Sequence, residues 1–421
     1  MNKKKNKRYS LTGYLKSLGP GLITGASDDD PSGIATYSQA GAEFGLATLW
    51  TAWITFPLMA SIQEMCARVG AVTSRGLAEI IKKHYSKKLL YILLIINFPA
   101  ITLNIGADIA GMGAVSHLLM PTIPSFVFSI IFTFALMFVI IKFSYKKIAS
   151  ILKWLCIVLF LYFIVPFIVT KSWHAVLKNT FIPSFHFNQE FCEILVAILG
   201  TTISPYLFFW QTNMEAEDTA VKKINIVVDK SFMQKIRSDV VTGMFFSNLV
   251  MFFIILTTGV VLFNGGIHKI ETVEQAAQAL QPLAGNLSYA LFAIGVIGTG
   301  LLAIPVLAGS LSYSLAETFD WKEGLDKKFN EARGFYITIV VSLLIGLVIN
   351  LTSIKPFYAL FVTALVYGLT APVLIAIILH ICNNRKIMGD DTNGLLSNIL
   401  GFITFFLMLA AAIALLYFQF K

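Results

Sequence analysis

Three consecutive aspartates, Asp28 to Asp30, stand in the middle of an apolar stretch and are followed at once by Pro31. A proline inside a helix removes a backbone hydrogen bond and clashes with the preceding turn, so a helix must break here. The break frees carbonyl oxygens beside carboxylates, and hard cations prefer both kinds of ligand. Because a charge at the centre of a membrane-spanning helix costs about 2.5 to 3.5 kcal/mol, this acidic run predicts a hydrated cation site lined by protein.

A second apolar stretch is interrupted in the same way at Pro205. Just before it stand Thr201, Thr202 and Ser204, whose hydroxyls and loosened carbonyls offer further oxygen ligands. Every candidate ligand at the two breaks is oxygen, which suits Mg²⁺ better than softer ions that take Cys, Met or His. The alternative is that these hydroxyls only bond back to the preceding helical turn.

Within the first break, Asp30 is the expected metal ligand, together with carbonyl oxygen near Ser27. A half-helix that ends near Ser27 would place its negative end beside Asp30, and Asp30 would cap a second half-helix that begins at Pro31. Capping without an ion is the alternative role for Asp30. Successive helical residues point about 100° apart, so Asp28 and Asp29 are expected to face water in a vestibule instead.

The composition requires a membrane protein. Of the 421 residues, 57% are hydrophobic and 13% are charged, which leaves too few polar residues to cover a soluble surface. We therefore expect an all-α integral membrane protein. Eleven apolar spans are predicted, at 18–46, 47–66, 90–115, 123–141, 148–170, 191–213, 239–263, 288–314, 335–352, 356–381 and 396–418.

The two breaks fall in the first and the sixth span. Two inverted repeats of five spans, each beginning with a broken helix, would produce this spacing. Repeat one then covers about 18–170, repeat two about 191–381, and an extra eleventh helix about 396–418. Connections of at most about 25 residues leave no room for a soluble module, so residues 1–421 are predicted to form a single transmembrane transporter domain.

The distribution of positive charge predicts the orientation. If the amino terminus is cytoplasmic, only five of the 32 lysines and arginines fall outside. These five are Lys171, Lys178, Lys269, Lys355 and Lys421, while Arg68 and Arg75 are placed on a cytoplasmic connection. We expect a multi-pass protein of the plasma membrane with an extracellular carboxyl terminus. The net charge of +9 then reflects membrane topology and not binding to nucleic acid.

The remaining functional groups argue against several classes of protein. No nucleophile with a base and no paired histidines lie in the spans, so an enzyme is not expected. The four cysteines have no ligand spacing, and no phosphate-binding loop is present. Neither a cofactor nor an obligatory protein partner is expected; the partners are divalent metal ions and the lipid bilayer. The acids Glu215, Glu217 and Asp218 are expected on a solvated cytoplasmic face.

Several segments together resemble the natural resistance-associated macrophage protein (NRAMP) family of divalent-metal transporters, over most of the chain. The matching segments are Gly19-Pro20-Gly21, Asp30-Pro31, residues 39–45, residues 67–73 with Leu77-Ala78-Glu79, Asp108-Ile109-Ala110, and residues 291–295. The resemblance implies a leucine-transporter-type fold with broken helices 1 and 6 and transport by alternating access.

The departures from the family pattern concern the metal site. Gly33 stands where manganese and iron transporters of the family carry an Asn ligand, Ser204 replaces their Met, and Tyr206 replaces the following His; Gly111 replaces a helix-3 acid. This pattern is similar to the NRAMP-related magnesium transporters of prokaryotes. Loss of the thioether and a site widened at Gly33 predict import of partly hydrated Mg²⁺, with Mn²⁺ also accepted. The predicted site comprises Asp30, Gly33, Ser27, Thr201, Thr202 and Ser204.

Coupling to protons is not expected. The resemblance implies proton co-transport through an acid and histidine chain, yet none of the six histidines falls in the middle of a predicted span. Asp108 remains the one acid deep in helix 3, where it could simply bond a neighbouring helix. Two alternatives stay open: a proton-coupled Mn²⁺ and Fe²⁺ importer, and an organic-solute symporter of the same fold.

Overall fold

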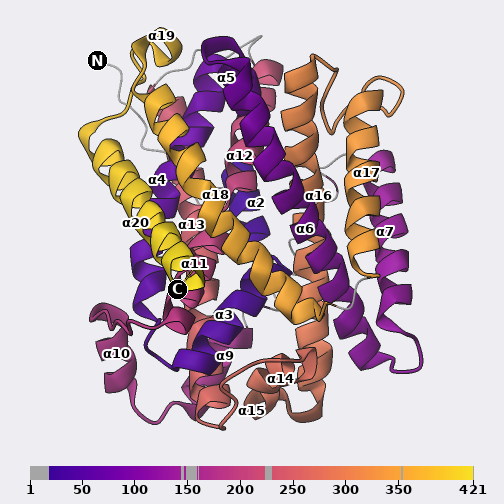
Figure 1. Cartoon of the computed structure of the whole chain (residues 1–421), viewed down its shortest axis with the longest axis vertical. Helices are drawn as coiled ribbons and strands as arrows, with labels where there is room; N and C mark the ends of the chain where they lie inside the picture. Colours follow the sequence, from indigo (N-terminus) through magenta and orange to yellow (C-terminus); the bar gives the residue numbers. More distant parts are fainter. Residues whose placement is uncertain are drawn as a thin grey trace, which may run out of the picture.

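The computed structural model describes residues 19–143, 161–222, 230–351 and 354–420, together with positions 147 and 159. Within these ranges the regular structure is helical and no strand occurs (Figure 1). The first half of the chain forms α2 (Pro20–Asp28), α3 (Pro31–Phe44), α4 (Trp50–Thr73), α5 (Leu77–His84), α6 (Lys87–Leu119), α7 (Ser125–Lys142), α9 (Leu161–Val169) and α10 (Trp173–Phe181). The second half forms α11 (Gln189–Thr202), α12 (Pro205–Lys222), α13 (Lys230–Thr258), α14 (Val273–Ala277), α15 (Gln281–Ala284), α16 (Ser288–Phe319), α17 (Arg333–Ile349), α18 (Pro356–Cys382), α19 (Arg385–Met388) and α20 (Leu395–Gln419).

The helices agree with the predicted spans. Among the described residues, seven helical segments are long and apolar enough to cross a membrane: α6, α7, α11 with α12, α13, α16, α18 and α20. The other four predicted spans correspond to the broken pair α2 and α3, to α4, to the shorter apolar helix α17, and to 148–170. Most of this last span lies outside the described residues, which include its final part as α9.

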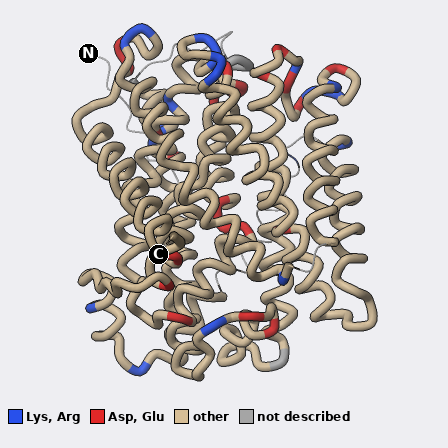
Figure 2. The backbone as a smooth tube through the Cα atoms, in the orientation of Figure 1, with Lys and Arg blue, Asp and Glu red and all other residues tan. Residues whose placement is uncertain are grey.

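The helices form one bundle with two distinct ends. Figure 1 shows α5 and α19 at one end and α10, α14 and α15 at the other. The charged residues concentrate at these two ends, while a few acidic stretches lie near mid-height (Figure 2). This is the charge distribution of a protein that crosses a bilayer. The chain therefore forms a multi-pass membrane protein, and the compartment at each end stays a prediction.

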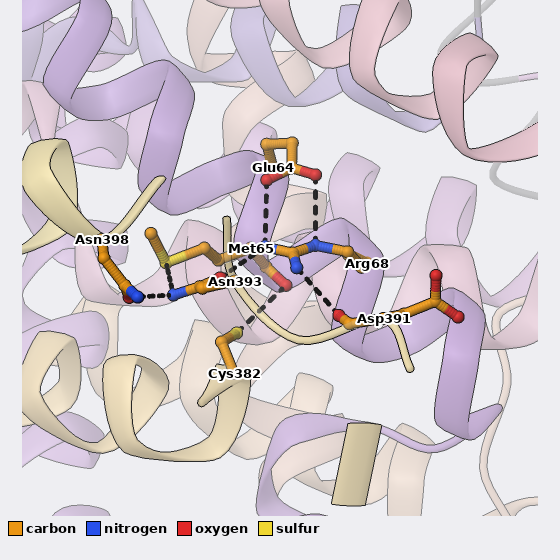
Figure 3. A network of polar contacts seen from close by, with 7 residues as sticks. All are labelled: Glu64, Met65, Arg68, Cys382, Asp391, Asn393 and Asn398. Atoms are coloured by element: carbon orange, nitrogen blue, oxygen red, sulfur yellow. Dashed lines mark hydrogen bonds and ion pairs between the residues drawn. The ribbon is translucent and has the colours of Figure 1, made fainter. Parts of the chain in front are cut away.

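Arg68 lies inside α4 and not on a connecting loop, so the predicted position of this arginine was wrong. Its side chain is only 8% exposed and pairs with Glu64 one helical turn earlier, at 3.2 Å (Figure 3). It also donates to the backbone oxygen of Asp391 at 2.9 Å and to Asn393, which in turn donates to Asn398 of α20. Because a buried charge needs partners, this network fixes α4 to the segment that joins α18 to α20.

The half-helix α2 lies directly against α13. A Cβ added at Gly25 would lie 2.3 Å from the backbone oxygen of Gly243, and one at Gly21 would lie 2.6 Å from the nitrogen of Val240. Small residues allow this close approach. At the same contact the carboxylate of Asp239 accepts hydrogen bonds from the backbone N–H groups of Gly19 and Gly21, at 2.9 and 2.8 Å. The free amino end of α2 is thus capped by a side chain of α13.

Candidate metal site

The first break has the predicted geometry. The half-helix α2 ends at Asp28, α3 begins at Pro31, and Asp30 is the amino-terminal cap of α3. Asp30 Oδ1 accepts a hydrogen bond from the backbone N–H of Gly33 at 2.7 Å. Asp30 is 2% exposed. Asp30 therefore caps α3, and the cap leaves lone pairs on the carboxylate for an ion.

Asn104 of α6 is a residue of this site that sequence reasoning missed. Its Nδ2 donates to Asp30 Oδ2 at 2.9 Å and lies 3.4 Å from Asp108 Oδ2. Both Asn104 and Asp108 are fully buried. They stand four residues apart, which places their side chains on one face of a helix, so the spacing could have linked them.

Asp28 and Asp29 do not face water, so the predicted vestibule at these two residues was wrong. They are 0% and 4% exposed, respectively. Ser247 of α13 donates to Asp28 Oδ2 at 2.6 Å and lies 3.5 Å from Asp29 Oδ1. The close contact between α2 and α13 explains the difference, because it covers the end of α2 with another helix.

No basic side chain pairs with the acids of the first break, or with Asp108 of α6 beside them, in the described part of the chain. Asp28, Asp29, Asp30 and Asp108 are all buried, and none of them takes part in the ion pairs found there. Asp28 Oδ1 and Asp108 Oδ1 are buried without any hydrogen-bond partner. Buried acceptors normally have partners and buried charges are normally paired, so this arrangement suits a cation.

The second break lies opposite the first. Helix α11 ends at Thr202 and α12 begins at Pro205. A Cβ added at Gly33 would lie 3.4 Å from Thr201 Oγ1 and 3.2 Å from the backbone oxygen of Asp28. Oxygens from the two breaks therefore meet at Gly33. The space that this glycine leaves is narrow, because the ring of Tyr37 also lies 3.4 Å from that Cβ position.

The hydroxyls of the second break have different partners. Ser204 donates back to the backbone oxygens of Gly200 and Thr201, at 2.9 and 2.6 Å, as the alternative reading expected. Thr202 Oγ1 lies 3.2 Å from the hydroxyl of Tyr37 on α3. Thr201 thus offers its hydroxyl toward Gly33, whereas Ser204 would reach an ion only through its remaining lone pairs.

Tyr206 joins the two breaks directly. Its hydroxyl donates to the backbone oxygen of Ser27 at 3.1 Å, and the residue is 1% exposed. The Ser27 hydroxyl donates back to Ile23 O at 2.9 Å. The sequence identified Tyr206 only as the replacement of a histidine, so this contact was missed. Gly111, which replaces an acid of the family pattern on helix 3, faces Leu360 and Pro31, so its surroundings are apolar.

A cavity lined by charged residues lies some distance from the break. Its volume is about 640 Å³, and it is lined by residues of α3, α11 and α18 and of the connection before α14. Its charged residues are Glu43, Glu190, Glu193, Lys269, Glu271 and Lys355. Glu43 stands 13 residues after Asp30, about 20 Å along the axis of α3, so this cavity is not the site itself.

Two further expectations can be compared with the structure. The six histidines lie in connections or near helix ends, such as His117 in the last turn of α6 and His380 in the last turn of α18. Glu215 is 3% exposed and accepts a hydrogen bond from Gln211 at 3.1 Å. The predicted solvated face was therefore wrong for Glu215.

Within the described residues, no three His, Cys, Asp or Glu side chains are close enough to hold a metal by themselves, so a site here must also use carbonyl, hydroxyl or water oxygen.

Comparison with known proteins identifies the family and the fold. The family model "Natural resistance-associated macrophage protein-like" matches residues 21–418. The chain is 26% identical over 422 residues to a divalent metal cation transporter, MntH, of Clostridium acetobutylicum, covering 100% of this chain and 95% of that protein. It is 23% identical to the MntH of Bacillus subtilis, covering 90% of this chain and 87% of that protein.

Solved structures show the same fold. A manganese transporter of Eremococcus coleocola superimposes with a TM-score of 0.76 at 18% identity, covering 96% of this chain and 87% of that one. Mhp1, a nucleobase-cation-symport-1 family transporter, superimposes with a TM-score of 0.56 at 12% identity, covering 96% and 92%. The predicted leucine-transporter-type fold is thereby confirmed, and the named relatives are transporters and not enzymes. Because its family model covers nearly the whole chain, this protein belongs to the natural resistance-associated macrophage protein-like family.

Proposed function

We propose that this protein is a secondary transporter that imports divalent metal ions across the plasma membrane by alternating access. Mg²⁺ is its main substrate, it carries Mn²⁺ as well, and the ion passes partly hydrated. The metal site comprises Asp30, carbonyl oxygen at Ser27 and Gly33, and oxygens of Thr201, Thr202 and Ser204.

One observation carries this proposal: three buried acids at a helix break, and a fourth, Asp108, which shares Asn104 with Asp30, have no basic partner among the described residues. A divalent cation would supply the missing positive charge. The candidate ligands around Gly33 are oxygens, which Mg²⁺ prefers, and no thioether stands at position 204.

The relatives favour a second candidate, a transporter that prefers Mn²⁺, since a structural neighbour is a manganese transporter. Uptake into proteoliposomes separates the two candidates. With a Mg²⁺-sensitive dye inside, saturable Mg²⁺ entry that Mn²⁺ inhibits is the expected result. Entry of Mn²⁺ with Mg²⁺ neither carried nor competing would overturn the choice of Mg²⁺ and leave the metal transporter intact.

Proton coupling is not part of the proposed mechanism. A relay across the membrane needs titratable groups in series, and the histidines of this chain lie in connections or near helix ends. A pH-sensitive dye inside the same vesicles should show no acidification during Mg²⁺ entry. Acidification that depends on Mg²⁺ would contradict uncoupled transport.

A further inference from the structure

The amide of Asn104 holds one of the two oxygens of the Asp30 carboxylate. Asn104 Nδ2 lies 2.9 Å from Asp30 Oδ2, and the backbone N–H of Gly33 donates to Oδ1 at 2.7 Å. Each oxygen of Asp30 therefore already accepts a hydrogen bond from the protein. Together the two donors, one from α3 and one from α6, fix the plane of the carboxylate.

A fixed carboxylate discriminates between ions by its mode of binding. Ca²⁺ commonly takes both oxygens of one carboxylate, whereas Mg²⁺ requires a near-ideal octahedron and usually keeps several waters. Each oxygen keeps a second lone pair, so the two donors do not block an ion, but they fix the plane of the carboxylate; turning Asp30 to present both oxygens to one ion would strain the bond to Asn104. Binding through a single oxygen leaves that bond intact.

We propose that Asn104 is a specificity-determining residue, which keeps Asp30 a one-oxygen ligand and so disfavours Ca²⁺ relative to Mg²⁺. This inference rests on the proposed function, since it takes Asp30 as a ligand. Asn104 Oδ1 is buried without a hydrogen-bond partner. That oxygen can accept a hydrogen bond from a water that the ion retains, which again favours an ion that keeps its waters.

The same helix offers a matched control. Asn97 is also buried in α6, at 3% exposed, and its Oδ1 also lacks a partner. Its Nδ2, however, donates to the backbone oxygen of Leu93 in its own helix, at 2.8 Å. Asn97→Ala therefore removes a buried amide from α6 without changing the bonds of Asp30.

The experiment is Mg²⁺ uptake into proteoliposomes at rising Ca²⁺ concentration. It compares the wild-type protein with Asn104→Ala, with the nearly isosteric Asn104→Leu, and with Asn97→Ala. We expect both Asn104 variants to lower the ratio of the Ca²⁺ inhibition constant to the Mg²⁺ KM by about tenfold, the scale of one hydrogen bond to a charged group. Asn97→Ala should keep the wild-type ratio. A purely structural loss would reduce uptake and leave the ratio unchanged.

The possible outcomes distinguish this inference from the proposed function. An unchanged ratio in the Asn104 variants overturns the inference while the proposed function stands. If these variants do not transport, calorimetric titration of the purified proteins with Mg²⁺ and Ca²⁺ gives the same ratio without requiring transport. If the wild-type protein carries Mn²⁺ but not Mg²⁺, the choice of Mg²⁺ fails and the ratio is measured against Mn²⁺. A wild-type protein that carries and binds none of these ions overturns both.

Discussion

At the scale of single residues, the Asp30 carboxylate has two tasks that a substitution can separate. It caps α3 through Gly33, and it is the proposed metal ligand. Asn is as good a cap as Asp, so Asp30→Asn retains the cap and removes the charge. The new amide nitrogen cannot accept the hydrogen bond from Asn104, so we expect a loss of about 1 to 3 kcal/mol in stability. Mg²⁺ uptake should fall much further, by at least about 100-fold.

A control for this substitution is Asp320→Asn at the end of α16. Asp320 pairs with Lys82, and its side chain is 84% exposed. Loss of such a pair should leave uptake unchanged. If Asp30→Asn also transports normally, Asp30 is a cap and not a ligand.

Glu323, in the connection between α16 and α17, gives a prediction about pH. Burial, with the nearby carboxylates of Glu217 and Glu79, raises the pKa of Glu323 from 4.5 to about 8. Between these two values the unfolded chain has released the proton that the folded protein keeps. Stability should therefore be greatest below pH 4.5, fall as the pH rises to about 8, and level off above it.

Glu323→Gln tests this dependence. The variant cannot lose a proton at position 323, so its thermal unfolding temperature should fall less between pH 5 and pH 8 than that of the wild-type protein. Equal pH profiles for the two proteins would show that Glu323 has an ordinary pKa in the folded state.

At the scale of elements, the contact between α2 and α13 depends on glycine. A Cβ at Gly25 would lie 2.3 Å from the backbone oxygen of Gly243, where only a shift of a whole helix could make room. Gly25→Ala should cost about 1 to 3 kcal/mol of stability. The unfolding temperature of the purified protein measures this cost.

Gly394→Ala is the matched control for the glycine contact. Gly394 precedes α20, and no atom lies within 4 Å of a Cβ placed there. The backbone of Gly394 is extended, with a φ of −77°, a conformation that any residue adopts. An unfolding temperature lowered equally in both variants would contradict a special role for the contact at Gly25.

The sequence predicted the helices and their breaks better than it predicted contacts between side chains. Pro31 and Pro205 predicted both breaks because proline cannot continue a helix, whatever surrounds it. The partners of the acids could not be predicted in the same way. Ser247 is 219 residues from Asp28 in the chain, and only the packing of α13 on α2 brings the two together. The four-residue spacing between Asn104 and Asp108 could have linked these two residues from the sequence. The contact of Asn104 with Asp30 could not be predicted, because it depends on where α6 packs against α3.

At the scale of the whole molecule, uncoupled import of a divalent ion depends on the membrane potential. An inside-negative potential favours entry by about 4.6 kcal/mol per 100 mV for two charges. Proteoliposomes with an inside-negative potential, set by potassium diffusion, should therefore take up more Mg²⁺ than vesicles without a potential. Equal Mg²⁺ uptake with and without the potential would show that a co-transported or exchanged ion balances the charge.

The acids at the end of α2 also bear on the order in which this protein is assembled. Three aspartates at mid-membrane would cost roughly 7.5 to 10.5 kcal/mol if the span that contains them entered the bilayer alone. Their hydrogen-bond donors, Asn104 and Ser247, are synthesised later, on α6 and α13. The broken span thus leaves the ribosome before the helices that satisfy its acids, and we expect it to gain a stable place in the bilayer only once α6 and α13 have arrived.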